Sequence, residues 1–341
     1  LLFLMSADTI PLVIISQRMV DGIGSFTFLM LSITQPFTVA LRATQQSALP
    51  LIASVTALGT NTFLNWVFIF GNLGAPALGV EGAALATAIA RLLEMLIILF
   101  EVFGLRNKIA GSLKDFFGYS RDLATRIVKN ALPTTTNETL WGIGTSLYIA
   151  AFARIGIAEG AAVQACNTIN NMFTLAAFSV GDAILILVGQ KLGEGKPELA
   201  YTMSKKMIKI GLVIGIVMGA GVIAAGEPLL SLFSFSRQGE EYAFRILIIY
   251  GLTMWLTIYN ATHVTGTLRC GGDTKFAMVT ETATVWLIGV PLAFITSLYL
   301  QWPIYLAVLA VKLEEAVKGI FLTKRYFSKK WLRNVIKDIG D

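Results

Sequence analysis

The sequence predicts an all-α, polytopic membrane protein. Of its 341 residues, 55% are apolar and 14% are charged, whereas a typical soluble domain carries about 25% charged residues. The apolar residues gather into stretches long enough to cross a bilayer as helices, which takes about 20 residues each. Basic residues collect in alternate connections between these stretches, as they do in membrane proteins of fixed orientation. Composition and pattern together exclude an ordinary soluble domain.

Nine membrane-spanning helices are expected, each bounded by charged residues or by Gly, Pro and Asn turns. They cover residues 22–41, 49–70, 78–103, 130–152, 161–190, 207–225, 242–268, 276–300 and 303–323. The first four residues, LLFL, are interpreted as the end of a further span that begins before this sequence does.

The basic residues predict the orientation of the chain. Most of the 27 lysines and arginines follow the first, third, fifth, seventh and ninth stretches, and loops rich in Lys and Arg face the cytoplasm. The C-terminus is therefore expected on the cytoplasmic side of the cell membrane. This orientation accounts for the net charge of +6 without a nucleic acid partner. Two cysteines and one histidine exclude a disulfide framework and a histidine-rich metal site.

An internal repeat relates two of the connections. The segment LRATQQSALP begins at Leu41 and LRCGGDTKFA begins at Leu268, an offset of 227 residues. Duplicated halves are common in transporters, where they move around a central site. If the two halves are equal in length, about 100 residues, or two helices and most of a third, are expected to precede Leu1.

Longer motifs follow one another along the chain. They are GVEGAALATAIAR, TNETLWGIGTSLY, LVGQKLGEGKPELA, LRCGGDTKFAM with VWLIGVPLAF, and KLEEAVKGIF with SKKWLRN. In order and spacing they resemble the multidrug and toxic compound extrusion (MATE) family, and its bacterial DinF-like branch above all. The resemblance implies a secondary transporter, not an enzyme, with twelve helices in two lobes. Such a transporter exports organic compounds, often cationic or amphipathic, in exchange for protons or sodium ions.

The same resemblance assigns the expected helices to lobes. Residues 1–115 would form a partial N-lobe, with the end of helix 3, helices 4–6 and the start of a linker. Residues 116–341 would form the C-lobe, with helices 7–12 and a cytoplasmic tail. The chain would thus hold about nine of twelve helices. We expect no cofactor beyond the coupling ion. The expected partners are small organic substrates and membrane lipid, and the protein is expected to be a monomer.

Two carboxylates inside predicted spans have no basic residue within one helical turn. Glu138 lies nine residues after Lys129 and Asp182 nine before Lys191, so both are expected about 13 Å from the cytoplasmic boundary. Buried acids at similar depth suit a proton-coupling site, and an unpaired charge in a span is a functional candidate. The family resemblance supports Glu138 in particular. Sodium is an alternative occupant at Glu138. Oxygen donors nearby are Thr136, Asn137 and Asn171.

Four further residues are weaker candidates. Glu281 is six residues beyond Lys275 and is expected either to pair with it or to serve the site. His263 either relays protons or forms a structural hydrogen bond with a neighbouring helix. Asn260 matches the tenth helix of the family. Pro133 either kinks its helix and gates access to Glu138, or is merely tolerated there.

Other polar groups are interpreted as structural. Arg91 with Glu94, Lys312 with Glu315, and Glu314 with Lys318 have the spacing of neutralising pairs on one helix face. The glycines of LRCGGDTK could suggest a phosphate loop, but the segment lacks its GKS or GKT ending. We expect Gly271 and Gly272 to end one helix, and Asp273 or Thr274 to cap the next.

Two alternative functions remain open. A lipid-linked saccharide flippase of the same superfamily should carry more basic residues in its cavity than the spans show. An integral-membrane transferase would need a catalytic His, Asp or metal cluster at a membrane face, and the sequence shows none.

Overall fold

The fold was obtained as a computed structural model, which describes residues 10–107, 109–111, 118, 121–233 and 235–333. Within these residues the regular structure is helical and contains no β-strand, so the all-α prediction is confirmed. Contacts divide the chain into two compact units, Leu1–Tyr119 and Ser120–Asp341. The LLFL segment lies outside the described residues.

The first unit is built from three long helices. They are α1 (Ile10–Ala43), α2 (Ala48–Phe70) and α3 (Val80–Leu99), with the short turns η2 (Asn72–Gly74) and η3 (Phe100–Gly104) after α2 and α3. Its core includes Leu41, Ala53 and Ile98. The predicted pair between Arg91 and Glu94 is confirmed at 2.6 Å. Ser54 on α2 also donates a hydrogen bond to Glu94, so this acid is satisfied within the unit.

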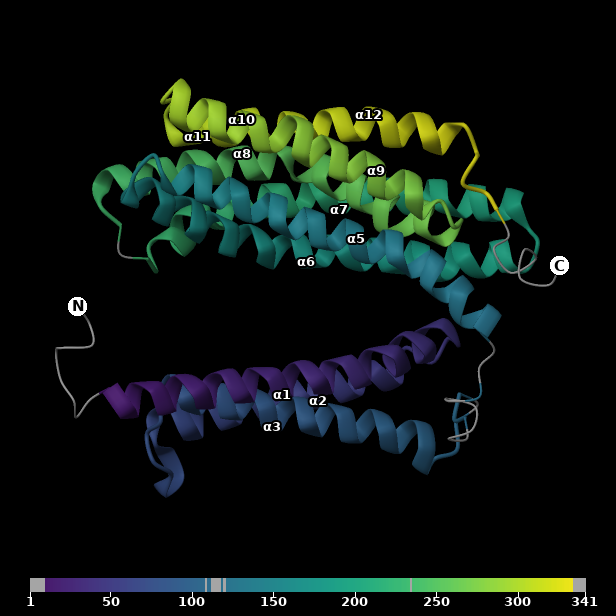
Figure 1. Ribbon diagram of the computed structural model, residues 1–341, viewed down its shortest axis with the longest axis horizontal. Coiled ribbons are helices and arrows are strands. Elements are labelled where there is room, and N and C mark those ends of the chain that lie inside the picture. The colour runs from purple at the N-terminus through teal and green to yellow at the C-terminus, as the bar shows by residue number, and fades with distance from the viewer. Residues whose placement is uncertain (1–9, 108, 112–117, 119–120, 234, 334–341) are drawn as a thin grey trace. The chain divides into compact units, whose positions relative to one another are not determined.

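The second unit contains the remaining helices, which lie side by side as long rods (Figure 1). They are α5 (Arg121–Ala153), α6 (Ile157–Gly193), α7 (Pro197–Leu230), α8 (Arg237–Ala261) continued by η4 (Thr262–Leu268), α9 (Thr274–Thr284) continued by η5 (Val285–Gly289), α10 (Val290–Phe294) and η6 (Ile295–Tyr299), then α11 (Ile304–Val311) and α12 (Leu313–Phe327). Its largest core cluster joins α5, α6, α8 and the segments from α10 to α11.

Six of the described helices are long and apolar enough to cross a membrane. They coincide with six of the nine predicted stretches, namely 49–70, 78–103, 161–190, 207–225, 242–268 and 276–300. The stretches 22–41 and 130–152 lie within α1 and α5, and 303–323 is divided between α11 and α12 at Lys312. Most helices run past the predicted ends. The 34 residues of α7, for example, span about 51 Å against a hydrocarbon core of about 30 Å.

The repeat found in the sequence is confirmed in the backbone. Gln45 and Gly272, which are 227 positions apart, both adopt positive φ angles, of 64° and 72°. In each copy the residue after this position donates its backbone N–H to the carbonyl oxygen of the leucine that begins the repeat. Gln46 donates to Leu41 over 2.9 Å, and Asp273 donates to Leu268 over 2.8 Å. Both turns therefore close in the same left-handed way, which glycine adopts most easily.

The side chain of Asp273, in the second turn, does not cap the following helix as we expected. Asp273 precedes α9 but makes no capping hydrogen bond with its side chain. Its two carboxylate oxygens instead accept hydrogen bonds of 2.6 and 3.0 Å from Arg325 of α12. This bond raises the pKa of Arg325, which lies beyond the predicted span. Gly271 is needed for space, because a Cβ there would overlap the backbone oxygen of Trp331. The turn therefore anchors the end of the chain's last helix.

Glycines allow α7 and α8 to approach each other closely. A Cβ on Gly219 would overlap the backbone oxygen of Gly251, and a Cβ on Gly251 would lie 2.6 Å from the oxygen of Gly219. Small residues at such crossings are typical of membrane helices, because they bring the two backbones into van der Waals contact.

Replacing Gly219 with alanine is therefore expected to lower the free energy of unfolding by about 1–3 kcal/mol, the usual cost of overpacking. Gly142 on α5 is the matched control, since a Cβ there meets nothing within 4 Å. Gly142→Ala should be neutral or stabilising by up to about 1 kcal/mol, because alanine favours the helix. Thermal unfolding in detergent checks both. An unfolding midpoint for Gly219→Ala at or above that of Gly142→Ala would contradict the packing argument.

Candidate functional site

A buried ammonium group on α12 lies among three carboxylates. The Lys318 side chain is 3% exposed. Its Nζ atom lies 3.2 Å from Glu315 Oε1 and 3.5 Å from Glu314 Oε1, both one turn earlier on the same helix. A third carboxylate comes from α9, where Glu281 Oε1 lies 3.9 Å from the same nitrogen. We call Lys318 and these three glutamates the Lys318 cluster.

Each glutamate of the Lys318 cluster also accepts a hydrogen bond from a neutral side chain. Asn137 Nδ2 on α5 donates to Glu281 Oε2 over 2.6 Å. Asn260 Nδ2 on α8 donates to Glu315 Oε2 over 2.5 Å and to the backbone oxygen of the same residue over 2.8 Å. The hydroxyl of Tyr148 on α5 donates to the remaining carboxylate. The cluster therefore holds four helices together.

Two carboxamide oxygens beside the cluster have no partner. Asn137 and Asn260 are 3% and 2% exposed, and the Oδ1 atom of each is buried without a hydrogen bond. A buried acceptor left unpaired costs about 1–3 kcal/mol. Carboxylate and carboxamide oxygens are the donor set of a hard cation such as sodium. Within the described part of the chain, no three His, Cys, Asp or Glu side chains are grouped as the ligands of a metal ion.

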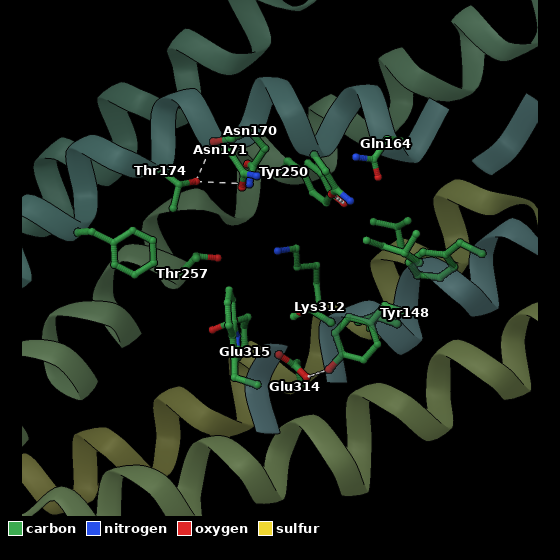
Figure 2. Close-up of a pocket in the computed structure, with 18 residues that line it drawn as sticks. Tyr148, Gln164, Asn170, Asn171, Thr174, Tyr250, Thr257, Lys312, Glu314 and Glu315 are labelled. Atoms are coloured by element: carbon green, nitrogen blue, oxygen red, sulfur yellow. Dashed lines mark hydrogen bonds between the residues drawn. The ribbon is translucent and has the colours of Figure 1, made fainter. Parts of the chain in front are cut away.

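A cavity of about 350 Å³ adjoins the cluster. One wall is a polar face of α6 that includes Asn167, Asn170 and Thr174, and Lys312, Glu314 and Glu315 lie on the opposite side. Figure 2 shows Lys312 reaching into the space between the two walls. Aromatic side chains supply much of the remaining lining: Trp141, Tyr148, Phe152, Phe178 and Tyr250. The cavity is thus polar on two sides and aromatic elsewhere.

A second, smaller cavity of about 110 Å³ also borders the cluster. Glu138 and Arg269 line it together with Asn260, Glu281 and Lys318. Trp141, Phe178, Thr257 and Glu315 line both cavities. The cluster therefore contributes to the lining of two adjoining cavities, a larger polar and aromatic one and a smaller charged one.

Glu138 does not lack a basic partner, so this expectation is wrong. Arg269, at the end of the η4 segment, donates a hydrogen bond to Glu138 Oε1. The Glu138 side chain is also 55% exposed rather than buried. The sequence search covered only one helical turn on either side, whereas the partner lies 131 residues further along the chain. The role of Glu138 in coupling stays a prediction.

The second predicted acid is not buried either. Asp182 is exposed on α6 and is not among the residues that line the two cavities, so its expected burial is wrong. Asn171 is also exposed, but it does line the larger cavity. Asn137 and Asn260, named from the sequence, both donate hydrogen bonds to glutamates of the Lys318 cluster, and Glu281 is one of these glutamates. Glu281 bonds to Lys318 and not to Lys275, so that expected pair is wrong.

His263 lies away from both cavity linings. Its ring is buried between the rings of Tyr259 and Tyr326, whose centroids are 4.6 and 5.0 Å away. Nδ1 lies 3.1 Å from Thr267 Oγ1, and Nε2 is buried without a partner. The hydrogen bond thus stays within the η4 segment and does not reach a neighbouring helix as the structural alternative expected, and the relay role stays a prediction. Pro133 is buried inside α5, which continues through it, and its gating role stays a prediction.

Sequence reasoning missed the residues that organise the site. Glu314 and Lys318 do form the predicted pair. The expected pair of Lys312 with Glu315 is wrong, because Glu315 binds Lys318 while the Lys312 ammonium lies 5.0 Å from the centre of the Tyr250 ring. The sequence did offer one signal, the count of charges. With Glu281 included there are three acids for the two lysines of the expected pairs, so pairing along one helix could not neutralise every acid.

An all-α bundle with helices of membrane-spanning length, and with a charged cluster that borders two cavities, is typical of polytopic membrane transporters. Residues 135–295 match the family model MatE. Over this stretch the chain is therefore similar to the MATE family, and its relatives and fold neighbours point the same way. The relatives that carry functional names are transporters or multidrug resistance proteins, which supports the expectation that the chain is not an enzyme. Assignment to the DinF-like branch stays a prediction.

Relatives of known sequence and structure illustrate this similarity. The chain is 25% identical over 277 residues to "Uncharacterized transporter YisQ" of Bacillus subtilis, which covers 79% of this chain and 59% of the relative. It is 25% identical over 327 residues to "Probable multidrug resistance protein NorM" of Thermotoga maritima, covering 93% and 68%. A solved structure described as the outward-facing conformation of a multidrug resistance MATE family transporter superposes with a TM-score of 0.74 at 20% identity, covering 85% of this chain and 65% of that one. The structural likeness shows the fold. The chain spans 59% and 61% of the first two relatives that it matches.

Proposed function

We propose that this protein is a secondary antiporter that exports organic compounds across the cell membrane in exchange for protons or sodium ions. Relatives named as multidrug resistance proteins support the export of organic compounds. The coupling ion is the only cofactor that the proposal requires. The C-terminus would be cytoplasmic, as the basic loops predict, and the protein would act as a monomer.

The observation that carries this proposal is the surplus of acid in the Lys318 cluster. Three glutamates surround one lysine, so the cluster holds two negative charges in excess when all groups are ionised. Lys312 nearby would offset only one of them. Excess charge at membrane depth is expensive, so one further cation, a proton or a sodium ion, would be bound there.

Asn137, beside the cluster, can serve both states of its glutamate. When Glu281 is ionised, Asn137 donates through Nδ2, and its Oδ1 is left without a partner. When that acid is protonated, rotation of the carboxamide by half a turn would let Oδ1 accept the new O–H. Asn260 is held more firmly, because its Nδ2 also donates to the backbone oxygen of Glu315 and the same rotation would break that hydrogen bond. A sodium ion would use the same oxygens directly.

Coupling follows because the cluster forms part of the larger cavity. Glu314 and Glu315 bond to Lys318 and also line that cavity. Binding of a cation at the cluster would therefore change the charge that a compound meets in the cavity. A cation and a cationic group on the compound would compete for the same surplus charge, which is the differential affinity that exchange requires.

Reconstituted protein in proteoliposomes tests the proposal. We expect a fluorescent organic cation to move against its concentration gradient when a proton or a sodium gradient is imposed, and to stop when an ionophore collapses that gradient. Transport at an unchanged rate after the collapse of both gradients would contradict antiport. Transport driven by only one of them would identify the coupling ion.

A further inference from the structure

Two exposed lysines from different segments lie over the same tyrosine ring at one end of the second unit. The ammonium nitrogen of Lys205 on α7 is 4.8 Å from the centre of the Tyr201 ring, and that of Lys329, just after α12, is 4.6 Å from it. The two positive charges therefore lie within about 10 Å of each other, close enough to repel in 0.1 M salt. Among the described residues, Glu198 supplies the only carboxylate within 4.0 Å of either nitrogen, at 3.4 Å from Lys329. We call Tyr201, Lys205 and Lys329 the Tyr201 site.

Aromatic packing beside the Tyr201 site holds its two segments together. Tyr201 stacks on Tyr326 of α12, with the ring centres 5.5 Å apart, and Tyr326 stacks in turn on the buried Trp331 at 5.6 Å. The Tyr326 hydroxyl also lies 2.8 Å from the hydroxyl of Ser204 on α7. The positions of the two lysines therefore rest on a buried aromatic layer that joins α7 to the end of α12.

More positive charge surrounds the site. The other basic residues on this part of α7 and at the end of α12 are exposed and form no ion pair with a described carboxylate: Lys206, Lys209, Lys324, Lys330 and Arg333. Glu194, in the turn before α7, is already bonded to Lys191 and Lys196, at 2.6 and 2.9 Å. The surface is therefore short of negative charge, and an anion from outside the chain would supply it.

The height of the Tyr201 site along α7 matches that of lipid headgroups. The exposed face of α7 changes from basic to apolar between Lys209 and Ile210, and Ile210 and Val213 are 55% and 60% exposed. Lys205 lies five residues before Ile210, which is about 7.5 Å along the helix axis. The polar layer of a bilayer is about 5–8 Å thick on each side of the hydrocarbon core. Lys205 therefore lies among the headgroups, while the apolar face beyond it contacts the acyl chains.

We propose that the Tyr201 site binds the phosphate of an anionic phospholipid, with hydrogen bonds from the ammonium groups of Lys205 and Lys329. Lysines gathered beside a membrane-spanning helix are typical of anionic lipid binding. A zwitterionic phospholipid suits the site less, because its choline group would lie among the surrounding lysines. A free phosphate lacks the acyl chains that the apolar face of α7 would hold. The inference requires the bundle to lie in a membrane, but it does not depend on antiport.

Native mass spectrometry of the delipidated protein in detergent tests the inference, with dioleoyl phosphatidylglycerol and dioleoyl phosphatidylcholine at equal concentration. The unchanged protein is expected to bind the anionic lipid about 20-fold or more tightly, because two lysines contribute. Lys205→Gln and Lys329→Gln should each lower this preference by about fivefold, the usual contribution of one lysine near an anionic membrane. Glu198→Gln should raise it, since it removes the acid that competes for Lys329.

Lys275→Gln is the matched control. Lys275 is exposed near the start of α9, beside the turn that binds α12 through Asp273, and it lies over no described aromatic ring. Each variant changes an exposed side chain, so all should fold as the unchanged protein does. Lys275→Gln should keep the lipid preference.

Three results would overturn the inference. The first is equal binding of the two lipids by the unchanged protein. The second is an equal loss of preference in Lys275→Gln and Lys205→Gln, because the attraction would then come from the net charge of the whole surface. The third is displacement of phosphatidylglycerol by sodium phosphate at the same concentration as the lipid, which would show that the site takes a free anion.

Discussion

Replacing Lys318 with methionine is expected to lower the free energy of unfolding by about 3–5 kcal/mol, the usual cost of removing one partner from a buried ion pair. Lys318 is buried and is the group that balances Glu281, Glu314 and Glu315 within the cluster. Methionine fills much of the same space, so the loss would come from charge and not from a cavity. The three carboxylates would then repel one another across α9 and α12.

Chemical unfolding in mixed micelles measures this effect. Lys329→Met is the matched control, because Lys329 also joins distant segments, by an ion pair of 3.4 Å with Glu198, but both side chains are exposed. Exposed pairs contribute about 0–1 kcal/mol, so this control should unfold almost as the unchanged protein does. A Lys318→Met protein as stable as the control would show that the glutamates do not depend on the lysine.

The double variant Lys318→Met with Glu315→Gln separates charge from packing. Glutamine keeps an oxygen that can accept the hydrogen bond from Asn260, but it removes one negative charge. If repulsion among the carboxylates causes the loss, the double variant should be more stable than Lys318→Met alone. Additive losses would point to packing instead.

The sequence was sufficient for those features that depend on local patterns. Apolar length located the helices, and the shared letters of the two repeats predicted turns that close alike at Gln45 and Gly272. Helix ends were less well placed, because charged residues such as Lys205 continue a helix into the interface as readily as they end it. Local rules also misjudged Asp273, whose partner Arg325 lies 52 residues away.

The site required contacts that no local pattern reveals. Asn137, Asn260 and Glu281 could each be named from the sequence, but their grouping depends on contacts between residues that are far apart in the chain, up to 144 positions for Asn137 and Glu281. Reading Lys318 as the partner of an acid on its own helix was correct and yet incomplete. The spacing rule counts neighbours along one helix, whereas the free energy of a buried charge depends on every helix around it.

Replacing Glu281 with glutamine is expected to abolish the effect of the coupling ion on substrate binding while leaving the fold intact. Glu281 has the longest contact to Lys318 of the three glutamates, 3.9 Å, so its charge stabilises the fold least. Glutamine can still accept the hydrogen bond from Asn137. In the unchanged protein, protons or sodium should change the affinity for an organic cation by about 5- to 150-fold, the range of typical coupling free energies. In the variant this ratio should fall to near one.

Glu138→Gln and Glu198→Gln complete the comparison. Glu198 is exposed and bonds to Lys329, so its variant should keep the full ion effect. Glu138 lines the small cavity beside Glu281, but Arg269 already balances its charge. Its variant should therefore reduce the ion effect less than Glu281→Gln does. The opposite ranking, with the ion effect lost in Glu138→Gln and kept in Glu281→Gln, would show that the coupling site is at Glu138, as the sequence alone predicts. It would also show that the surplus charge of the Lys318 cluster serves the fold, because a coupling site must hold the group whose charge changes between the two states.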